Sequence, residues 1–136
     1  MKLTATELRR LFANVPVVIA PDRDYLCPTR RWLLGQVYDS FAGFLGTYGQ
    51  RYERQFDCDD FARTFAVWAV LENAQRTKDA EGIAVGELFY RRRDGGGHAI
   101  NVAVLEDKKT LYIEPQTGRP IRLNKDEVGS IWFVRF

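Results

Sequence analysis

The sequence predicts an α+β fold in which helices come first and an antiparallel β-sheet follows. Apolar residues recur at helical spacing through the first half, and the longest such segment runs from Cys58 to about residue 76. The second half consists of short runs rich in β-branched and aromatic residues, divided by turn sequences such as Asp94 to Gly97. We therefore expect N-terminal helices, with the long central helix packed on the sheet.

Two further helices are indicated by residues that cap helix ends. Thr4 and Glu7 match the capping-box pattern and predict a helix over about residues 5–13. Thr29 is expected to cap a second helix over about residues 30–46.

The remaining segments are assigned to strands and loops. Residues 15–20 are expected to be extended, and residues 22–28 to form a loop. Asn124 and Glu127 predict one helical turn before the last strand. The strands predicted in the second half are residues 83–92, 98–106, 110–114, 120–123 and 131–136.

The composition is typical of one globular domain without a nucleic-acid or membrane partner. The 136 residues predict a single domain over 1–136, with a helical half over about 1–80 and a sheet half over about 81–136. The net charge of +2 is too balanced to imply binding to nucleic acid or to an anionic membrane. Charges interrupt the N-terminus, and no apolar run approaches the roughly 20 residues that span a bilayer. We therefore expect a cytoplasmic protein.

The counts of histidine and cysteine limit the chemistry of the chain. His98 is the one histidine, and Cys27 and Cys58 are the two cysteines. These counts exclude a multi-histidine metal site and a disulfide scaffold, and we expect neither a metal nor a cofactor. In a reducing cytoplasm both cysteines are expected to be free, with a Cys27–Cys58 disulfide as the alternative.

The residues best suited to chemistry are Cys58, His98 and Glu114. Cys58 lies at the predicted start of the central helix, where the helix dipole lowers a thiol pKa. His98 opens a predicted strand, and an imidazole beside the thiol would pair with the thiolate. Glu114 on the next strand is expected about 7–8 Å diagonally from His98, where a carboxylate would orient the ring. Gln116 is the rival for that orienting role.

Strand alternation predicts how His98 meets the helix. His98 shares a face with Ile100 and Val102, whereas Asn101 lies on the opposite face. We expect the His98 face to pack on the central helix, close to Cys58. The structural alternative is that Cys58 is a buried small hydrophobe and His98 a core residue.

Three segments resemble the transglutaminase-like branch of the papain-like cysteine hydrolases. They are residues 57–62 around Cys58, residues 97–102 around His98 and residues 112–118 around Glu114. The resemblance implies a papain-like fold in which Cys58 is the nucleophile, His98 the general base and acid, and Glu114 the orienting acid. That acid is more usually an aspartate in this family. Residues 86–90, followed by His98, are also similar to peptidoglycan-cleaving enzymes of the NlpC/P60 type.

Other polar and aromatic residues have less specific assignments. The second oxyanion-hole donor has four candidates, which are Gln50, Tyr52, Gln55 and Trp32. The three tryptophans are expected in the core, with Trp32 also a candidate for the wall of the cleft. Asp59 and Asp60 are expected to be helix-start residues and not metal ligands. The run from Arg91 to Arg93 is expected to be a solvated strand end, with binding of a substrate carboxylate or phosphate as the alternative.

The sequence thus predicts a thiol-dependent amide hydrolase or acyltransferase that works through a thioester. Its expected partner is a peptide, a protein or a peptidoglycan-like amide. A non-catalytic module of the same fold, which binds a protein or a saccharide, is the alternative function. An endopeptidase of the NlpC/P60 type is a further alternative.

Overall fold

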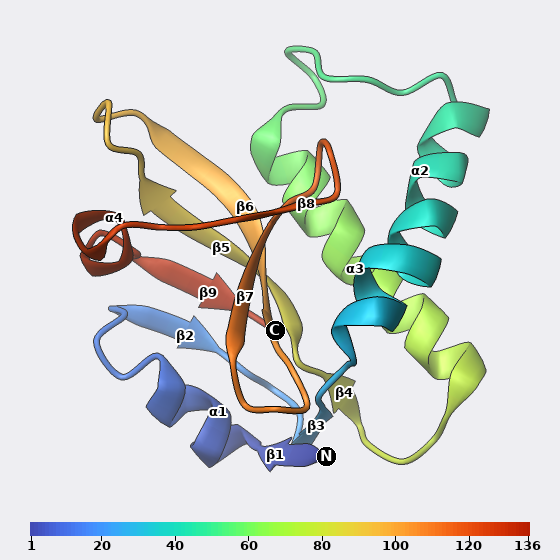
Figure 1. Cartoon of the computed structure of the whole chain (residues 1–136), viewed down its shortest axis with the longest axis vertical. Coiled ribbons are helices and arrows are strands. Elements are labelled where there is room, and N and C mark those ends of the chain that lie inside the picture. Colours follow the sequence, from blue (N-terminus) through green and yellow to red (C-terminus); the bar gives the residue numbers. More distant parts are fainter.

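The fold consists of two β-sheets with helices packed on both sides (Figure 1). The computed structural model describes residues 1–136. The helical segments are α1 (Ala5–Leu11), the π-helical η1 (Trp32–Val37), α2 (Tyr38–Thr47), α3 (Cys58–Arg76) and α4 (Lys125–Gly129). The strands are β1 (Lys2–Thr4), β2 (Val17–Ile19), β3 (Asp24–Leu26), β4 (Gly82–Ile83), β5 (Val85–Arg91), β6 (Gly97–Val104), β7 (Thr110–Glu114), β8 (Arg119–Ile121) and β9 (Phe133–Arg135).

The sheets are mixed, which corrects the expectation of one antiparallel sheet built from residues 81–136. The larger sheet has the order β2-β9-β5-β6-β7-β8, and the smaller has the order β1-β3-β4. Strands β1, β2 and β3 come from the first 26 residues, and the β2–β9 and β3–β4 pairings are parallel. Such three-residue strands are too short to show an alternating pattern. Their pairing with distant strands therefore leaves no local trace in the sequence.

The central helix α3 begins at Cys58 and ends at Arg76, as its apolar spacing predicts. Its buried side includes Phe61, Phe65 and Ala69, which pack on β5 and β6. The backbone amide of Asp57 donates to the carboxylate of Asp60 at 3.3 Å and fixes the first turn. Cys58 is therefore held at the start of a helix that is anchored on the sheet.

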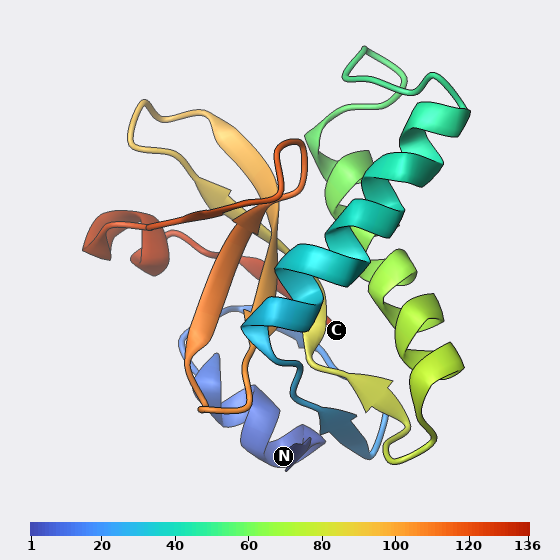
Figure 2. The same cartoon turned by 45° about the vertical axis from the view of Figure 1, so that its right-hand side comes forward.

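The second predicted helix is present but is divided into η1 and α2. The Thr29 hydroxyl accepts a hydrogen bond from the Trp32 amide at 3.1 Å, as expected for its cap. Figure 2 shows α2 beside α3 on one side of the larger sheet. The rings of Phe41 and Phe65 meet edge to face between these helices, with their centroids 5.2 Å apart.

The two faces of the larger sheet are buried in separate apolar clusters. One cluster contains Ile100 and Val102 and is packed against α1, whereas the other contains Ala103 and is packed against α2 and α3. The face that His98 shares with Ile100 is therefore turned away from α3, contrary to the prediction. Because β6 is apolar on both faces, its alternation does not indicate which face meets the helix.

Asn101 fastens α3 to the sheet. This side chain is fully buried, and its amide group donates to the Ala62 carbonyl at 2.7 Å and the Gly86 carbonyl at 3.0 Å. Ala62 lies one turn after Cys58, and Asn101 lies three residues after His98. The contact therefore fixes the start of α3 relative to the first residues of β6.

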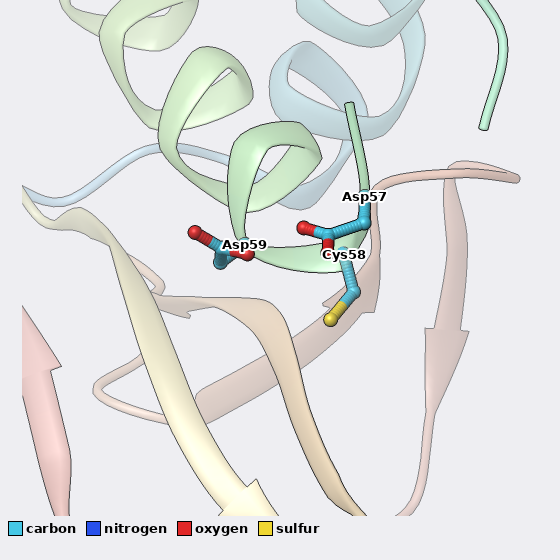
Figure 3. A group of neighbouring side chains, drawn as sticks. All are labelled: Asp57, Cys58 and Asp59. Carbon is cyan, nitrogen blue, oxygen red and sulfur yellow. The ribbon is translucent and has the colours of Figure 1, made fainter. Parts of the chain in front are cut away.

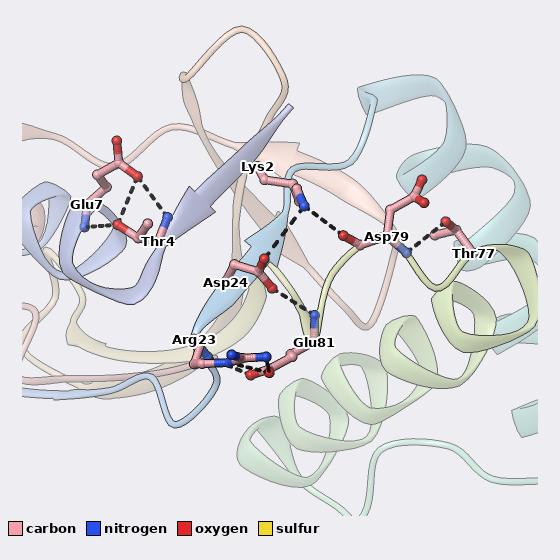
Figure 4. A network of polar contacts seen from close by, with 8 residues as sticks. All are labelled: Lys2, Thr4, Glu7, Arg23, Asp24, Thr77, Asp79 and Glu81. Atoms are coloured by element: carbon pink, nitrogen blue, oxygen red, sulfur yellow. Dashed lines mark hydrogen bonds and ion pairs between the residues drawn. The ribbon is translucent and has the colours of Figure 1, made fainter.

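A polar network joins the small sheet to the segment that follows α3 (Figure 4). The Lys2 ammonium donates to the Asp79 carbonyl at 2.9 Å and lies 3.6 Å from the Asp24 carboxylate. Arg23 forms an ion pair with Glu81, whose backbone amide donates to Asp24 at 2.9 Å. These contacts hold the chain where it leaves α3 and enters β4.

None of the helices has both the length and the apolar character needed to cross a membrane.

Candidate functional site

A small hollow lies where the start of α3 meets the ends of β5 and β6. Its volume is about 200 Å³. Cys58 and Asp59 line it from the helix, and His98 lines it from the sheet. The other lining residues are Phe89, Gly97, Ala99 and Trp132. The structure thus brings Cys58 and His98 to one pocket, although α3 covers the opposite face of β6.

His98 is oriented by Glu114. The ring nitrogen Nε2 lies 2.8 Å from Oε2 of Glu114, and the other carboxylate oxygen accepts the Gln116 amide at 3.2 Å. The carboxylate accepts only, so Nε2 carries the proton and Nδ1 of a neutral ring is an acceptor. The His98 side chain is 4% exposed, so this bond holds the ring firmly. Gln116 contributes its backbone here, and its side chain has no recorded bond to His98.

The turn that carries Glu114 is fixed by α2. The Tyr38 hydroxyl donates to the Pro115 carbonyl at 3.1 Å. Gly118 has a φ of +72°, and a Cβ atom at this position would overlap the Tyr38 ring. Only glycine fits this backbone and this contact. Tyr38, which lies 76 residues before Glu114 in the sequence, therefore helps to hold the turn that positions Glu114.

The Cys58 thiol is partly exposed and free. Figure 3 shows its sulfur pointing from the first helical turn toward the strands, close to the carboxylates of Asp57 and Asp59. The recorded side-chain bond of His98 goes to Glu114 and not to Cys58. The backbone amide of Cys58 has no recorded acceptor, as expected at a helix start. The lining of the hollow thus combines a partly exposed thiol with the ring of His98.

Asp57, Cys58 and Asp59 form the cluster with metal-ligating potential. Their ligand atoms lie within 4.8 Å of one another. A hydrogen bond that the protonated Asp59 side chain donates to the Asp57 carboxylate is the main cause of the raised pKa of Asp59, and burial raises it further. Arg63 lies 3.5 Å from the Asp59 carboxylate on the next turn. The carboxylates therefore present acceptors for hydroxyl groups or for a cation.

Trp132 is the residue of this site that the sequence analysis missed. Its side chain was expected in the core, but it is 40% exposed and lines the hollow. Its ring meets Phe89 edge to face with centroids 6.0 Å apart, and its edge lies 3.6 Å from the Cβ position of Gly97. The three glycines before His98 were the available signal, because they leave space for a ring over the backbone.

The candidates for an oxyanion donor lie elsewhere. Gln50 donates to Arg51 and Glu53 within the loop before α3. Tyr52 is 55% exposed in the same loop, where Gln55 is exposed as well. None of the three lines the hollow.

Trp32 is at the other end of α3. The Arg76 guanidinium stacks on its ring at 3.9 Å. Arg76 ends the helix that Cys58 begins, so about 27 Å of helix separates them. The indole is 8% exposed in the core and does not belong to the wall of the site.

Solved structures share this fold. A structure described as "PSL1a-E64 complex" matches with a TM-score of 0.74 and 23% identity, over 99% of this chain and 51% of that chain. Polyporus squamosus lectin bound to the human-type influenza-binding epitope Neu5Aca2-6Galb1-4GlcNAc matches with a TM-score of 0.69 and 22% identity. That match covers 99% of this chain and 49% of the lectin chain. The chain therefore spans about half the length of these solved chains.

These matches correct the prediction of a papain-like (transglutaminase-like) fold. The fold is the one found in the Polyporus squamosus lectin chain, with a mixed sheet of six strands beside a sheet of three. The error has a physical reason. A cysteine, a histidine and an acid can take up similar positions on unrelated folds, so three short motifs do not determine a topology.

The family assignment is corrected as well. The family described as Agglutinin C-terminal matches residues 33–120, whereas no curated protein matches the chain. The assignment to transglutaminase-like or papain-like hydrolases is therefore wrong, and a description as a cysteine peptidase has no support in these matches. The matched range includes both Cys58 and His98 and covers more than half of the sequence. The chain belongs to the Agglutinin C-terminal family.

Proposed function

We propose that the chain is a saccharide-binding module and that the hollow at Cys58 and His98 is its sugar site. The observation that carries this proposal is the exposed indole of Trp132 beside Asp59 and His98. A sugar ring has an apolar C–H face and a rim of hydroxyl groups. The indole supplies a flat apolar surface for the face, and the carboxylate and Nδ1 supply acceptors for the hydroxyls.

The size of the hollow supports a single sugar unit at its centre. Its volume of about 200 Å³ is smaller than the roughly 300–1,000 Å³ of common small-molecule pockets. A longer glycan would place one unit against Trp132 and extend over the neighbouring surface. The Polyporus squamosus lectin, of which this chain spans about half, is bound to such a glycan in its own structure.

Calorimetric titration with Neu5Acα2-6Galβ1-4GlcNAc tests the proposal. We expect the trisaccharide to bind the wild-type chain and Trp132→Ala to weaken binding by about tenfold or more, because the stacking surface is lost. Tyr48→Ala is the matched control, since Tyr48 is a 74% exposed aromatic residue outside the hollow. Absence of binding, or equal binding by the Trp132 variant, would contradict the proposal.

The same pocket supports a second candidate, a thiol-dependent acyl-transfer site. The observation that favours it is the bond of His98 to Glu114, which leaves Nδ1 free in the pocket that contains Cys58. In this role Cys58 is the nucleophile, His98 moves the proton and Glu114 orients the ring. The similar structure described as an E64 complex makes this role worth testing alongside sugar binding.

The chemistry of this second candidate balances with the residues present. The Cys58 thiol gives its proton to Nδ1 of His98, and the thiolate attacks an amide carbonyl. The oxygen of the resulting intermediate lies near the free Cys58 amide. The imidazolium then protonates the leaving amine, and a thioester remains on Cys58. Water or a second amine takes up the acyl group, and the donor would be a peptide, a protein or a peptidoglycan-like amide.

Alkylation by iodoacetamide across a pH series tests the thiol role. We expect His98→Ala to slow the alkylation of Cys58, because the thiolate loses its partner cation. The series is run on a Cys27→Ser background so that one thiol is counted by intact mass. Equal alkylation rates in both proteins across the pH series would remove the acyl-transfer candidate and leave sugar binding untouched.

A further inference from the structure

A second, mostly apolar hollow lies between α3, the first half of β5 and the end of β9. Its volume is about 230 Å³. The residues that line it are Arg63, Ala66, Val67, Val70, Val85, Glu87, Arg135 and Phe136. None of them lines the proposed sugar site. We call this region the α3 hollow.

The helical wall of the α3 hollow presents apolar surface to water. Ala66, Val67 and Val70 lie three and four residues apart on α3, so their side chains point to the same side of the helix. Val67 is 53% exposed and Val70 is 50% exposed. An apolar body that filled the hollow would remove this surface from water, which is favourable.

Glu87 is the buried polar group of the α3 hollow. Its side chain is 5% exposed, and its Oε2 atom is enclosed without a hydrogen-bond partner. The Arg63 guanidinium lies 3.9 Å from this oxygen, which is beyond hydrogen-bond range. A buried carboxyl group that lacks a donor costs free energy. A ligand that brings a donor to Glu87 would offset this cost.

The charges around Glu87 favour a neutral ligand. Strand pairing places Arg135 of β9 directly opposite Glu87, with Cβ atoms about 4.5–5.5 Å apart in such pairs. Arg63 and Arg135 both act on Glu87 through their charges. A cationic ligand would therefore meet two arginines, and an anionic ligand would meet the Glu87 carboxylate. Guanidinium groups also stack on aromatic faces, which favours a ligand with an aromatic ring.

The size of the α3 hollow suits one or two fused rings. An apolar protein cavity of roughly 150 Å³ takes up benzene. The α3 hollow, at about 230 Å³, is larger than such a cavity. It therefore has room for a bicyclic aromatic molecule.

We propose that the α3 hollow binds a small neutral aromatic molecule with one N–H or O–H donor, of the indole or phenol kind. The ring lies against Val67 and Val70, and the donor bonds to the Glu87 carboxyl group. This site is separate from the proposed sugar site and does not depend on sugar binding.

The test compares two ligands of one shape, of which only one has a donor. Calorimetric titration is performed with indole and with benzofuran, in which an oxygen atom replaces the N–H group. We expect indole to bind about tenfold more tightly, because only its N–H can bond to a carboxyl group in this site. Equal affinity for the two ligands, or no binding of indole, would overturn the inference.

A variant of Glu87 assigns the preference for indole to its carboxyl group. Glu87→Met removes the acceptor and keeps a side chain of similar length, so the two ligands should bind this variant equally. Glu106→Met is the matched control, because Glu106 is an exposed glutamate outside the α3 hollow. A preference for indole that persists in Glu87→Met would contradict the proposed contact.

A second pair of variants tests the location without changing a buried group. Val67→Phe adds a ring at the half-exposed edge of the α3 hollow and should reduce indole affinity at least tenfold. Leu71→Phe is its control, since Leu71 is 51% exposed on the same helix but does not line the hollow. Undiminished indole binding by Val67→Phe would place the ligand elsewhere and overturn the inference.

Discussion

Glu87 is a carboxylate buried on β5 without a hydrogen bond to Oε2. The Arg63 guanidinium lies 3.9 Å from this oxygen and provides only a loose ion pair. Burial is the main cause of the raised pKa of Glu87, and the charges of Arg63 and Arg135 oppose it. The folded state therefore holds the Glu87 proton more tightly than the unfolded state does. The stability from this group is present below the ordinary pKa and is lost as pH rises through the folded value.

Replacing Glu87 by glutamine tests whether the buried charge of Glu87 destabilises the folded protein. We expect Glu87→Gln to raise the free energy of unfolding at pH 7 by about 1 kcal/mol, because a poorly compensated buried charge is removed. The gain should disappear below about pH 4. Glu81→Gln is the control with the opposite sign, since its hydrogen bonds with Arg23 lower the pKa of Glu81. Urea unfolding at several pH values measures both, and a Glu87 variant less stable than wild type at pH 7 would contradict the account.

At the residue scale the sequence indicated part of the site. Cys58 and His98 were predicted to meet and do line one pocket, and Glu114 bonds to His98. Trp132 was expected in the core and lines the pocket, whereas Trp32 lies in the core as expected and does not line the pocket, for which it was also a candidate. Both lie in apolar segments, and the exposure of an indole depends on which distant segment covers it. That information is absent from the local sequence.

At the scale of elements, Asn101 links α3 to the β5–β6 pair. Asn101→Asp would replace the amide donor by a carboxylate that faces the Ala62 and Gly86 carbonyls. We expect a loss of about 3 kcal/mol in the free energy of unfolding, since a buried charge would lack a donor. Trp132 fluorescence should also change, because the start of α3 moves relative to β6.

Asn73→Asp is the matched control for this substitution. Asn73 is buried on the same helix, and its side-chain oxygen accepts from Arg76 at 3.3 Å, a bond that aspartate keeps. We expect only a small change in stability for this variant. If the two variants were equally stable in thermal unfolding, the proposed link between helix and sheet would be refuted.

Element prediction succeeded where the sequence pattern is long. The 19-residue α3 shows a sustained helical period and starts at the predicted residue. Strands β5, β6 and β7 agree with the predicted runs within a few residues. Strand β3 was expected to be a loop, because three residues between Arg23 and Cys27 show no alternation. Its strand character comes from pairing with β1 and β4.

At the scale of the whole molecule, both faces of the larger sheet are covered. The cluster with α1 and the cluster with α2 and α3 meet the same central strands from opposite sides. The sequence indicated a helix packed on a sheet, but not that N-terminal strands extend both sheets. Parallel contacts such as β2 with β9 join residues more than 100 positions apart, so no local pattern specifies them.

Above all, we propose that sugar binds in the hollow shared by Trp132, Cys58 and His98. The most direct measurement is the rate of Cys58 alkylation by iodoacetamide, with and without saturating Neu5Acα2-6Galβ1-4GlcNAc, on the Cys27→Ser background. A sugar unit over Trp132 would cover the thiol, so we expect the bound glycan to slow alkylation at least fivefold, in line with mass-action protection. An unchanged alkylation rate at saturating glycan would place the sugar elsewhere and contradict the claim.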